Sequence, residues 1–189
     1  MRRIRIVVAY DGTNYCGWQI QPNGITIEEI LNRQISKLTG EDIRIIGASR
    51  TDSGVHALGN VAVFDTESRI PGDRFAYALN QKMPEDIVIV RSDEVQIDWH
   101  PRYQNEISKT YEYHIYNAKV RNPLKNRYST FVSFDLDVEK MRQGAKYILG
   151  EHDFASFCNV RTNAKDTVRT VHEIDRKSTR LNSSHMNLS

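Results

Sequence analysis

The sequence predicts an α+β fold in which helices cover one face of a sheet. Strand-like and helix-like patterns alternate along most of the 189 residues, and the spacing between strand patterns is hairpin-like. With 39% hydrophobic residues, the chain is also apolar enough to bury a core at this length.

The first half opens with a strand pattern over residues 3–10, in which Ile4, Ile6 and Val8 share one face. A polar loop follows over residues 11–24. Thr26 then begins a helix, with Glu29 as its capping-box partner, and Gly40 ends it. The apolar stripe of this helix consists of Ile27, Ile30, Leu31, Ile35 and Leu38.

Two further strands are predicted at residues 43–46 and 58–64. Pro71 suits an early position of a second helix, because its missing N–H has no helical partner there. The buried side of that helix consists of Phe75, Ala78, Leu79 and Met83. Residues 87–90 form the next predicted strand.

The second half begins with strict alternation over residues 108–117, which places Tyr111, Tyr113 and Ile115 on one face. Asp137 caps a last helix, whose inward side is expected to be Val138, Met141, Ala145, Ile148 and Leu149. Residues 168–174 form a final predicted strand. Residues 177–189 are rich in Ser and Asn and show no period, so we expect a disordered or artefactual tail there.

The segment of residues 49–56 lies between two apolar, strand-like runs. Asp52 is flanked there by Arg50, Thr51, Ser53 and Gly54, a composition that suits a carboxylate presented on a tight loop. An ionised Asp near a cation can act as a nucleophile. The same five residues are also compatible with an ordinary turn, since Asp, Ser and Gly are common in turns.

The stretch of residues 47–61 resembles the catalytic signature of the tRNA pseudouridine synthase A (TruA) family. Four other segments resemble the family in the same order, and together the resemblance covers residues 1–176. They are Tyr10-Asp11-Gly12-Thr13 with Gly17-Trp18-Gln19, Ala78-Leu79-Asn80, Lys109-Thr110-Tyr111-Glu112-Tyr113, and Thr167-Val168-Arg169-Thr170. Ser49 departs from the Gly that many members carry.

The resemblance implies a pseudouridine synthase fold: two similar α/β halves with a mostly antiparallel sheet, around a central cleft. Residues 1–104 would form the N-terminal half with the Asp loop, and residues 105–176 an incomplete C-terminal half. It also implies isomerisation of uridine to pseudouridine at positions 38–40 of the tRNA anticodon stem-loop, without a cofactor. Full-length members act as homodimers, which we do not carry over to this fragment.

By the same resemblance, Asp52 is the nucleophile, attacking C6 or C1′ of the nucleotide or assisting elimination from the sugar. Tyr111 would stack on the uracil. Arg50 would either fill the space that the extruded nucleotide leaves or stabilise the ionised carboxylate of Asp52. Lys109, Arg121 and Arg169 are candidate RNA contacts.

Family members also pair the catalytic Asp with a basic residue nearer the C-terminus. We expect this chain to be a truncated fragment that lacks that residue and has little or no activity. A fragment that only binds RNA is therefore an alternative. A hydrolase that uses Asp52 and His56 on a small substrate is another, and it predicts no affinity for RNA.

Charge gives only local support for RNA binding. The chain carries 26 Lys and Arg against 24 Asp and Glu, and Lys177 and Arg180 lie in the tail, so residues 1–176 balance. Residues 102–127 are locally basic, with Tyr residues among the bases. Such a segment could bind single-stranded RNA through phosphate contacts and base stacking, but the same pattern is typical of a strand with one exposed face.

Several other classes of protein are disfavoured. No apolar run is long enough to cross a membrane. Cys16 and Cys158 stand far apart and the six His are scattered, so neither a disulfide framework nor a metal site is expected. We expect a cytoplasmic protein.

Overall fold

The computed structural model describes residues 1–103, 108–158, 166–179 and 183–188, and the side chains up to Asp175. The chain divides into two compact units, Met1–Ile107 and Ser108–Ser189, and each is described by itself. The boundary expected between residues 104 and 105 falls outside the described residues.

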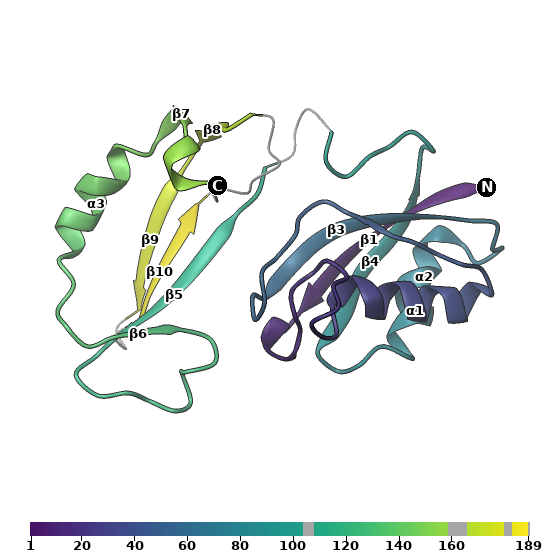
Figure 1. Ribbon diagram of the computed structural model, residues 1–189, viewed down its shortest axis with the longest axis horizontal. Helices are drawn as coiled ribbons and strands as arrows, with labels where there is room; N and C mark the ends of the chain where they lie inside the picture. The colour runs from purple at the N-terminus through teal and green to yellow at the C-terminus, as the bar shows by residue number, and fades with distance from the viewer. Residues whose placement is uncertain (104–107, 159–165, 180–182, 189) are drawn as a thin grey trace. The chain divides into compact units, whose positions relative to one another are not determined.

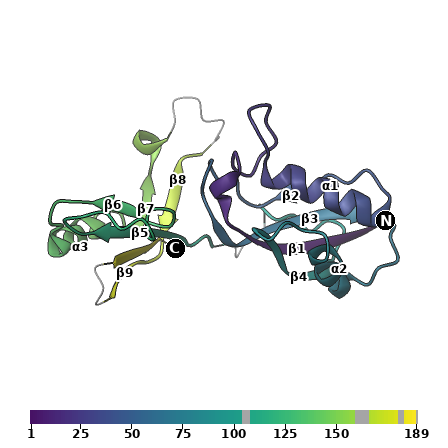
Figure 2. The ribbon, with the colours of Figure 1, turned by 90° about the horizontal axis from the view of Figure 1, so that it is seen from below.

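The first unit is built on a four-stranded antiparallel sheet with the strand order β2-β3-β1-β4 (Figures 1 and 2). The strands are β1 (Arg2–Tyr10), β2 (Ile46–Gly47), β3 (Ala57–Thr66) and β4 (Ile87–Val95). Strand β1 is central, so that Ile6 pairs with Ala62 on one side and with Ser92 on the other. The predicted strand pattern of β1 is confirmed.

The core of the first unit lies between one face of this sheet and two helices, α1 (Ile27–Thr39) and α2 (Phe75–Asn80). The sheet contributes Ile4, Ile6 and Val8, which are 0% exposed, as the period-2 pattern predicts. The helices contribute Ile27, Ile30, Leu31, Ile35, Phe75 and Leu79. On the opposite face, Arg3 and Arg5 form two-point ion pairs with Asp65 and Asp93.

Helix α1 has the caps that the sequence predicts. The Thr26 hydroxyl accepts a hydrogen bond from the Glu29 N–H, and Gly40 ends the helix at a φ of 76°. Helix α2 follows a short 3-10 turn, Gly72–Arg74, and lies along the edge strand β4. The Asn80 side chain bonds both the N–H and the C=O of Ile89, which satisfies backbone groups of that strand.

Strand β2 is shorter than the strand expected at residues 43–46. The N–H of Ile43 donates to the Ser36 hydroxyl, and the N–H of Ile45 donates to the Asn32 side-chain oxygen. Both acceptors lie on α1. These two N–H groups are therefore satisfied by helix side chains instead of by a neighbouring strand.

The second unit contains a four-stranded sheet in the order β6-β5-β10-β9 and a two-stranded sheet of β7 and β8. The elements are β5 (Tyr111–Asn117), β6 (Thr130–Val132), α3 (Val138–Lys146), β7 (Gly150–Asp153), β8 (Val168–Val171), β9 (Ile174–Thr179) and β10 (Ser183–Leu188). Strand β5 runs parallel to β6 and antiparallel to β10. The predicted α+β class with mostly antiparallel sheets is confirmed.

Two features of this unit differ from the sequence expectation. Helix α3 is capped by Asp137 as predicted, but it ends at Lys146, before the expected inward residues Ile148 and Leu149, and none of its residues is fully buried. Residues 177–179 and Ser183–Leu188 lie in paired strands where an irregular tail was expected. Strands pair through backbone hydrogen bonds, which do not require alternating apolar residues. A composition rich in Ser and Asn therefore does not exclude strands in this segment. No helix in the described ranges is both long and apolar enough to cross a membrane.

Candidate active site

The Asp52 loop, residues 49–56, is held by hydrogen bonds from the polar loop that follows β1. The carbonyl of Tyr15 accepts from the Gly54 N–H at 3.3 Å and from the Ser53 hydroxyl at 3.2 Å. The Trp18 N–H donates to the Thr51 carbonyl at 3.0 Å. Backbone contacts therefore fix the residues on both sides of Asp52.

Two glycines allow these loops to approach so closely. Gly17 has a φ of 79°, and a Cβ on it would lie 2.5 Å from the Thr51 carbonyl oxygen. A Cβ on Gly12 would overlap the Val55 carbonyl oxygen. Any larger residue at either position would push the Asp52 loop away from its support.

A buried polar network supports the same loop from the sheet. Tyr10, at the end of β1, is 5% exposed, and its hydroxyl lies 2.9 Å from Thr51 Oγ1. Asn60 on β3 donates to the Tyr10 hydroxyl at 3.5 Å and to the Ser49 carbonyl at 3.0 Å. Burial raises the pKa of the Tyr10 hydroxyl, while its hydrogen bonds to Thr51 and Asn60 act in the other direction.

Trp18 completes this support through packing. Its side chain is 1% exposed, and its ring lies so close to Gly47 that a Cβ there would be 2.6 Å from the ring atoms. Trp18 is therefore a core residue beneath the loop. The large, rigid indole ring at this position supports the start of the loop by packing.

The Asp52 side chain is exposed at a cavity of about 250 Å³, which we call the Asp52 cavity. It is lined by Cys16, Gln19, Ile20, Gln21, Arg50, Thr51, Asp52 and Ser53. Among the described residues, no hydrogen bond or ion pair is made by the Asp52 carboxylate. Arg50 is exposed at the same cavity without an ion pair to it. The carboxylate is thus held by its backbone and presented to solvent.

His56 has a structural environment. Its Nδ1 accepts a hydrogen bond from the Gly12 N–H at 3.1 Å and lies 3.0 Å from an Asp11 carboxylate oxygen. This contact joins the end of the Asp52 loop to the end of β1. Because Nδ1 of His56 is engaged with Gly12 and Asp11, the geometry favours a role in holding the loop over one as a general base.

The other predicted residues lie in the second unit. Tyr111 begins β5 and is 52% exposed, and Lys109 precedes it on the exposed chain. Arg121 is exposed and its guanidinium lies over the Phe131 ring, 4.8 Å from the centroid. Arg169 is exposed on β8, with one nitrogen donating to the Val168 carbonyl. All four are accessible, and their roles stay predictions.

Sequence reasoning missed the residues that support the loop. The sequence places Tyr10 and Gln19 in segments that resemble the family, and Asn60 in the stretch 47–61, but assigns them no role, and Cys16 and Gln21 fall in a polar loop without a role. The signal for Asn60 was available: it is a polar residue at a core-facing position of an apolar strand. Such a residue needs a partner, and here the partners lie in the Asp52 loop.

Comparison with known proteins agrees with this geometry. The family described as tRNA pseudouridine synthase matches residues 6–104 and 145–187. A protein of Acetivibrio thermocellus named tRNA pseudouridine synthase A is 49% identical over 174 residues, which are 92% of this chain and 71% of that protein. Proteins of the same name from Thermoanaerobacter sp. and Brevibacillus brevis are each 45% identical, over 92% and 91% of this chain and 71% and 70% of their own lengths. The chain therefore belongs to the tRNA pseudouridine synthase family, a family of isomerases.

Proposed function

We propose that this protein isomerises uridine to pseudouridine in the anticodon stem-loop of tRNA, at positions 38–40, with Asp52 as the nucleophile. In this reaction the N1–C1′ bond breaks and a C5–C1′ bond forms. The proton on C5 is lost and N1 gains one, so the reaction has no net oxidation and needs no cofactor. Asp52 would attack C6 or C1′, or assist elimination from the sugar.

The presentation of Asp52 carries this proposal. The Asp52 side chain is exposed at the Asp52 cavity, while the Thr51 carbonyl and the Gly54 N–H are hydrogen-bonded to the preceding loop. A nucleophile that must approach one atom of a nucleotide benefits from such a fixed backbone, because positioning supplies part of the rate enhancement. A merely structural Asp would be expected to use its carboxylate oxygens for caps or ion pairs, and this one does not among the described residues.

Arg50 is exposed at the same cavity and makes no ion pair to Asp52, which supports the first of its two expected roles. We infer that its side chain occupies the space vacated by the extruded nucleotide, recovering part of an unstacking cost of about a few kcal/mol. Tyr111 would stack on the detached uracil, with its hydroxyl near the C5 proton.

The remaining parts of the proposal come from the family. The tRNA is the partner, the compartment is the cytoplasm, and a homodimer is expected of the full-length member. Lys109, Arg121 and Arg169 are exposed cations that would contact RNA phosphates.

A second candidate function is RNA binding without turnover. The observation that favours it is the lack of any cation in contact with the Asp52 carboxylate within the described ranges. A catalytic carboxylate with no cationic partner is less well oriented, so we expect the turnover of this chain to be low. The two candidates differ only in whether Asp52 reacts.

The test uses a tRNA transcript that contains uridine tritiated at C5, with the protein in excess over the RNA. Synthase activity predicts tritium release by the wild-type chain and none by Asp52→Asn, with equal tRNA affinity for both. The matched control is Asp42→Asn, which removes a carboxylate from an exposed position outside the Asp52 cavity.

The outcomes separate the candidates. Tight tRNA binding without any tritium release from the wild-type chain would support the binding function and reject the synthase function for this chain. Lack of tRNA affinity would reject both. Tritium release that survives Asp52→Asn would reject Asp52 as the nucleophile.

A further inference from the structure

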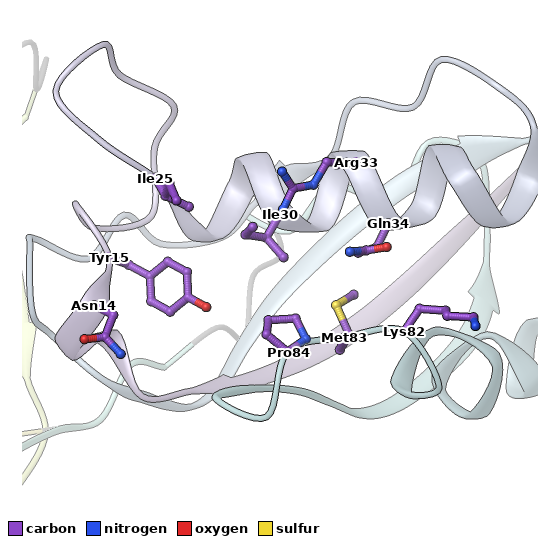
Figure 3. A pocket seen from close by; sticks show the side chains of 9 residues that line it. All are labelled: Asn14, Tyr15, Ile25, Ile30, Arg33, Gln34, Lys82, Met83 and Pro84. Carbon is purple, nitrogen blue, oxygen red and sulfur yellow. The ribbon is translucent and has the colours of Figure 1, made fainter.

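A second cavity, which we call the Tyr15 cavity, lies in the first unit and shares no lining residue with the Asp52 cavity (Figure 3). Its volume is about 360 Å³, within the range of small-ligand sites. It is lined by Asn14, Tyr15, Ile25, Ile30, Arg33, Gln34, Lys82, Met83 and Pro84. These residues come from the polar loop, from α1 and from the turn between α2 and β4.

The lining combines an apolar floor with a polar rim. Figure 3 shows the Tyr15 ring beside Ile30, with Met83 and Pro84 close by. The rim holds two amides and two cations, and no acidic side chain is among the lining residues. Within the described residues, none of the four polar side chains is used in a hydrogen bond or ion pair with the protein. The rim is therefore both positively charged and available to a ligand.

The carboxylate of Asp86, which is not among the lining residues, offsets part of the positive charge of Arg33 and Lys82. Its Oδ1 accepts a hydrogen bond from the hydroxyl of the lining residue Tyr15 at 2.6 Å. Burial raises the pKa of that hydroxyl, and Asp86 raises it further, so it stays protonated and keeps donating. The positive charge of Arg33 lowers the pKa of the Tyr15 hydroxyl, so this charge lies near the Tyr15 end of the cavity.

The Tyr15 cavity is connected to the Asp52 loop through one residue. The Tyr15 side chain lines the cavity, while its carbonyl accepts the hydrogen bonds from Ser53 and Gly54. The next residue, Cys16, already lines the Asp52 cavity. The two cavities are therefore lined by consecutive residues of one loop.

We propose that the Tyr15 cavity binds a second nucleotide of the tRNA, outside the reacting uridine, an inference that rests on the proposed function. Arg33 and Lys82 would neutralise phosphates, the two amides would bond to base edges or to a 2′-hydroxyl, and the apolar floor would support a base. Apolar contact together with phosphate charge is the combination that single-stranded RNA requires. Nothing in the lining repels a polyanion.

The experiment measures tRNA affinity as a function of salt by fluorescence anisotropy, with the full chain. The Arg33→Gln/Lys82→Gln variant should weaken binding about tenfold near 0.1 M salt. The slope of log affinity against log salt should fall by about one to two, because up to two phosphate contacts are lost. The matched control is Lys37→Gln/Arg69→Gln, which removes two exposed cations of the same unit outside the cavity.

The control should change affinity less than about twofold and leave the salt slope near its wild-type value. Equal losses in the two double variants would overturn the proposal, since the effect would then be one of overall charge. An unchanged affinity in Arg33→Gln/Lys82→Gln would also overturn it. All four residues are exposed, and each single variant is measured in case a double variant unfolds.

The apolar part of the lining has its own readout at Ile25, which is 54% exposed. Ile25→Ser should weaken tRNA binding without changing the salt slope, because Ile25 contributes contact area and no charge. Val88→Ser, at a similarly exposed position on β4, is the control. The proposed function is judged separately by tritium release and its loss in Asp52→Asn, so it stands even where the Tyr15 cavity variants bind tRNA normally.

Discussion

The hydroxyl of Tyr10 lies 2.9 Å from Oγ1 of Thr51, the residue that precedes Asp52. Tyr10 ends the central strand of the first sheet, and its side chain is 5% exposed. Asn60 donates to the same Tyr10 oxygen, so this hydroxyl joins residues of β1, β3 and the Asp52 loop. The rigid centre of the sheet is thereby connected to the loop that carries the candidate nucleophile.

Tyr10→Phe should separate positioning from binding. The variant keeps the ring and loses the hydrogen bond to Thr51, so the free energy of unfolding should fall by about 1 kcal/mol. Tritium release should fall further than this loss of stability explains, while tRNA affinity stays unchanged, because Asp52 is less well placed. Chemical denaturation and single-turnover kinetics measure the two effects.

Tyr77→Phe is the control for this substitution, since Tyr77 is 71% exposed on α2 and remote in the chain from the loop. A Tyr10→Phe protein that loses stability but releases tritium at the wild-type rate would contradict the positioning role.

Gly17→Ala should damage the site more than the same change at Gly40. Both residues have a positive φ, 79° and 76°, so both substitutions cost about 1 kcal/mol in backbone strain. Only Gly17 faces an obstacle, the Thr51 carbonyl at 2.5 Å, whereas a Cβ on Gly40 meets nothing within 4 Å. We expect about 3 kcal/mol of destabilisation for Gly17→Ala, together with loss of tritium release.

The measurement is denaturant unfolding of both variants, with amide chemical shifts of residues 49–56 as a local readout. The amide chemical shifts of this loop should differ from the wild type in Gly17→Ala and match the wild type in Gly40→Ala. Equal stability and equal loop shifts for the two variants would show that the close approach of the loops is not needed.

Local chemistry explains why much of the first unit was predictable. Thr26 and Gly40 end α1 through contacts within a few residues, and the alternation of Ile4, Ile6 and Val8 reports a single buried face. The loop position of Asp52 could be predicted in the same way, because turn composition is local, whereas its role as nucleophile is a prediction from the family resemblance. These features depend little on distant parts of the chain.

The supports of the site could not be predicted, because they are long-range. Tyr10 and Thr51 are 41 residues apart, and no pattern in the sequence pairs them. The short β2 has the same cause, since Asn32 and Ser36 of α1 take the amides that a strand would pair. The capping residue and the amphipathic pattern predict the start of α3, but they do not fix where the helix ends or whether a partner covers its apolar side.

Stability at high pH should depend on Tyr15. Its pKa is raised in the folded protein by burial and by Asp86, whereas an unfolded Tyr titrates near pH 10. The stabilisation is therefore fully present below pH 10 and is lost as the pH rises toward the higher native value. Above pH 10, the unfolded chain releases a proton that the native protein keeps. The free energy of unfolding should thus fall by up to about 1.4 kcal/mol per pH unit from this residue.

Tyr15→Phe should remove that contribution, so that its stability falls less steeply than the wild type between pH 10 and 11.5 in urea titrations. Tyr77→Phe should keep the wild-type dependence, because its side chain is largely in solvent. If the free energy of unfolding of Tyr15→Phe falls with pH as steeply as that of the wild type, the Tyr15–Asp86 hydrogen bond does not contribute to the pH dependence of stability.

Tyr111 and Tyr113 offer a matched pair for testing the proposed base-stacking residue. Both lie on the same face of β5, two residues apart, and they are 52% and 57% exposed. Tyr111→Phe keeps an aromatic ring for stacking and removes the hydroxyl near the C5 proton. Tritium release should fall by about 100-fold if that hydroxyl takes part in proton transfer, with tRNA affinity unchanged.

Tyr111→Leu removes the ring as well and should also weaken tRNA binding, since stacking on one base contributes about 1–3 kcal/mol. Tyr113→Phe and Tyr113→Leu should leave release near the wild-type rate, because that residue matches no family role. Single-turnover release and anisotropy measure the two quantities in all four variants. Equal effects at the two positions would show that both tyrosines have only a structural role in β5, and would contradict a role for Tyr111 in stacking or proton transfer.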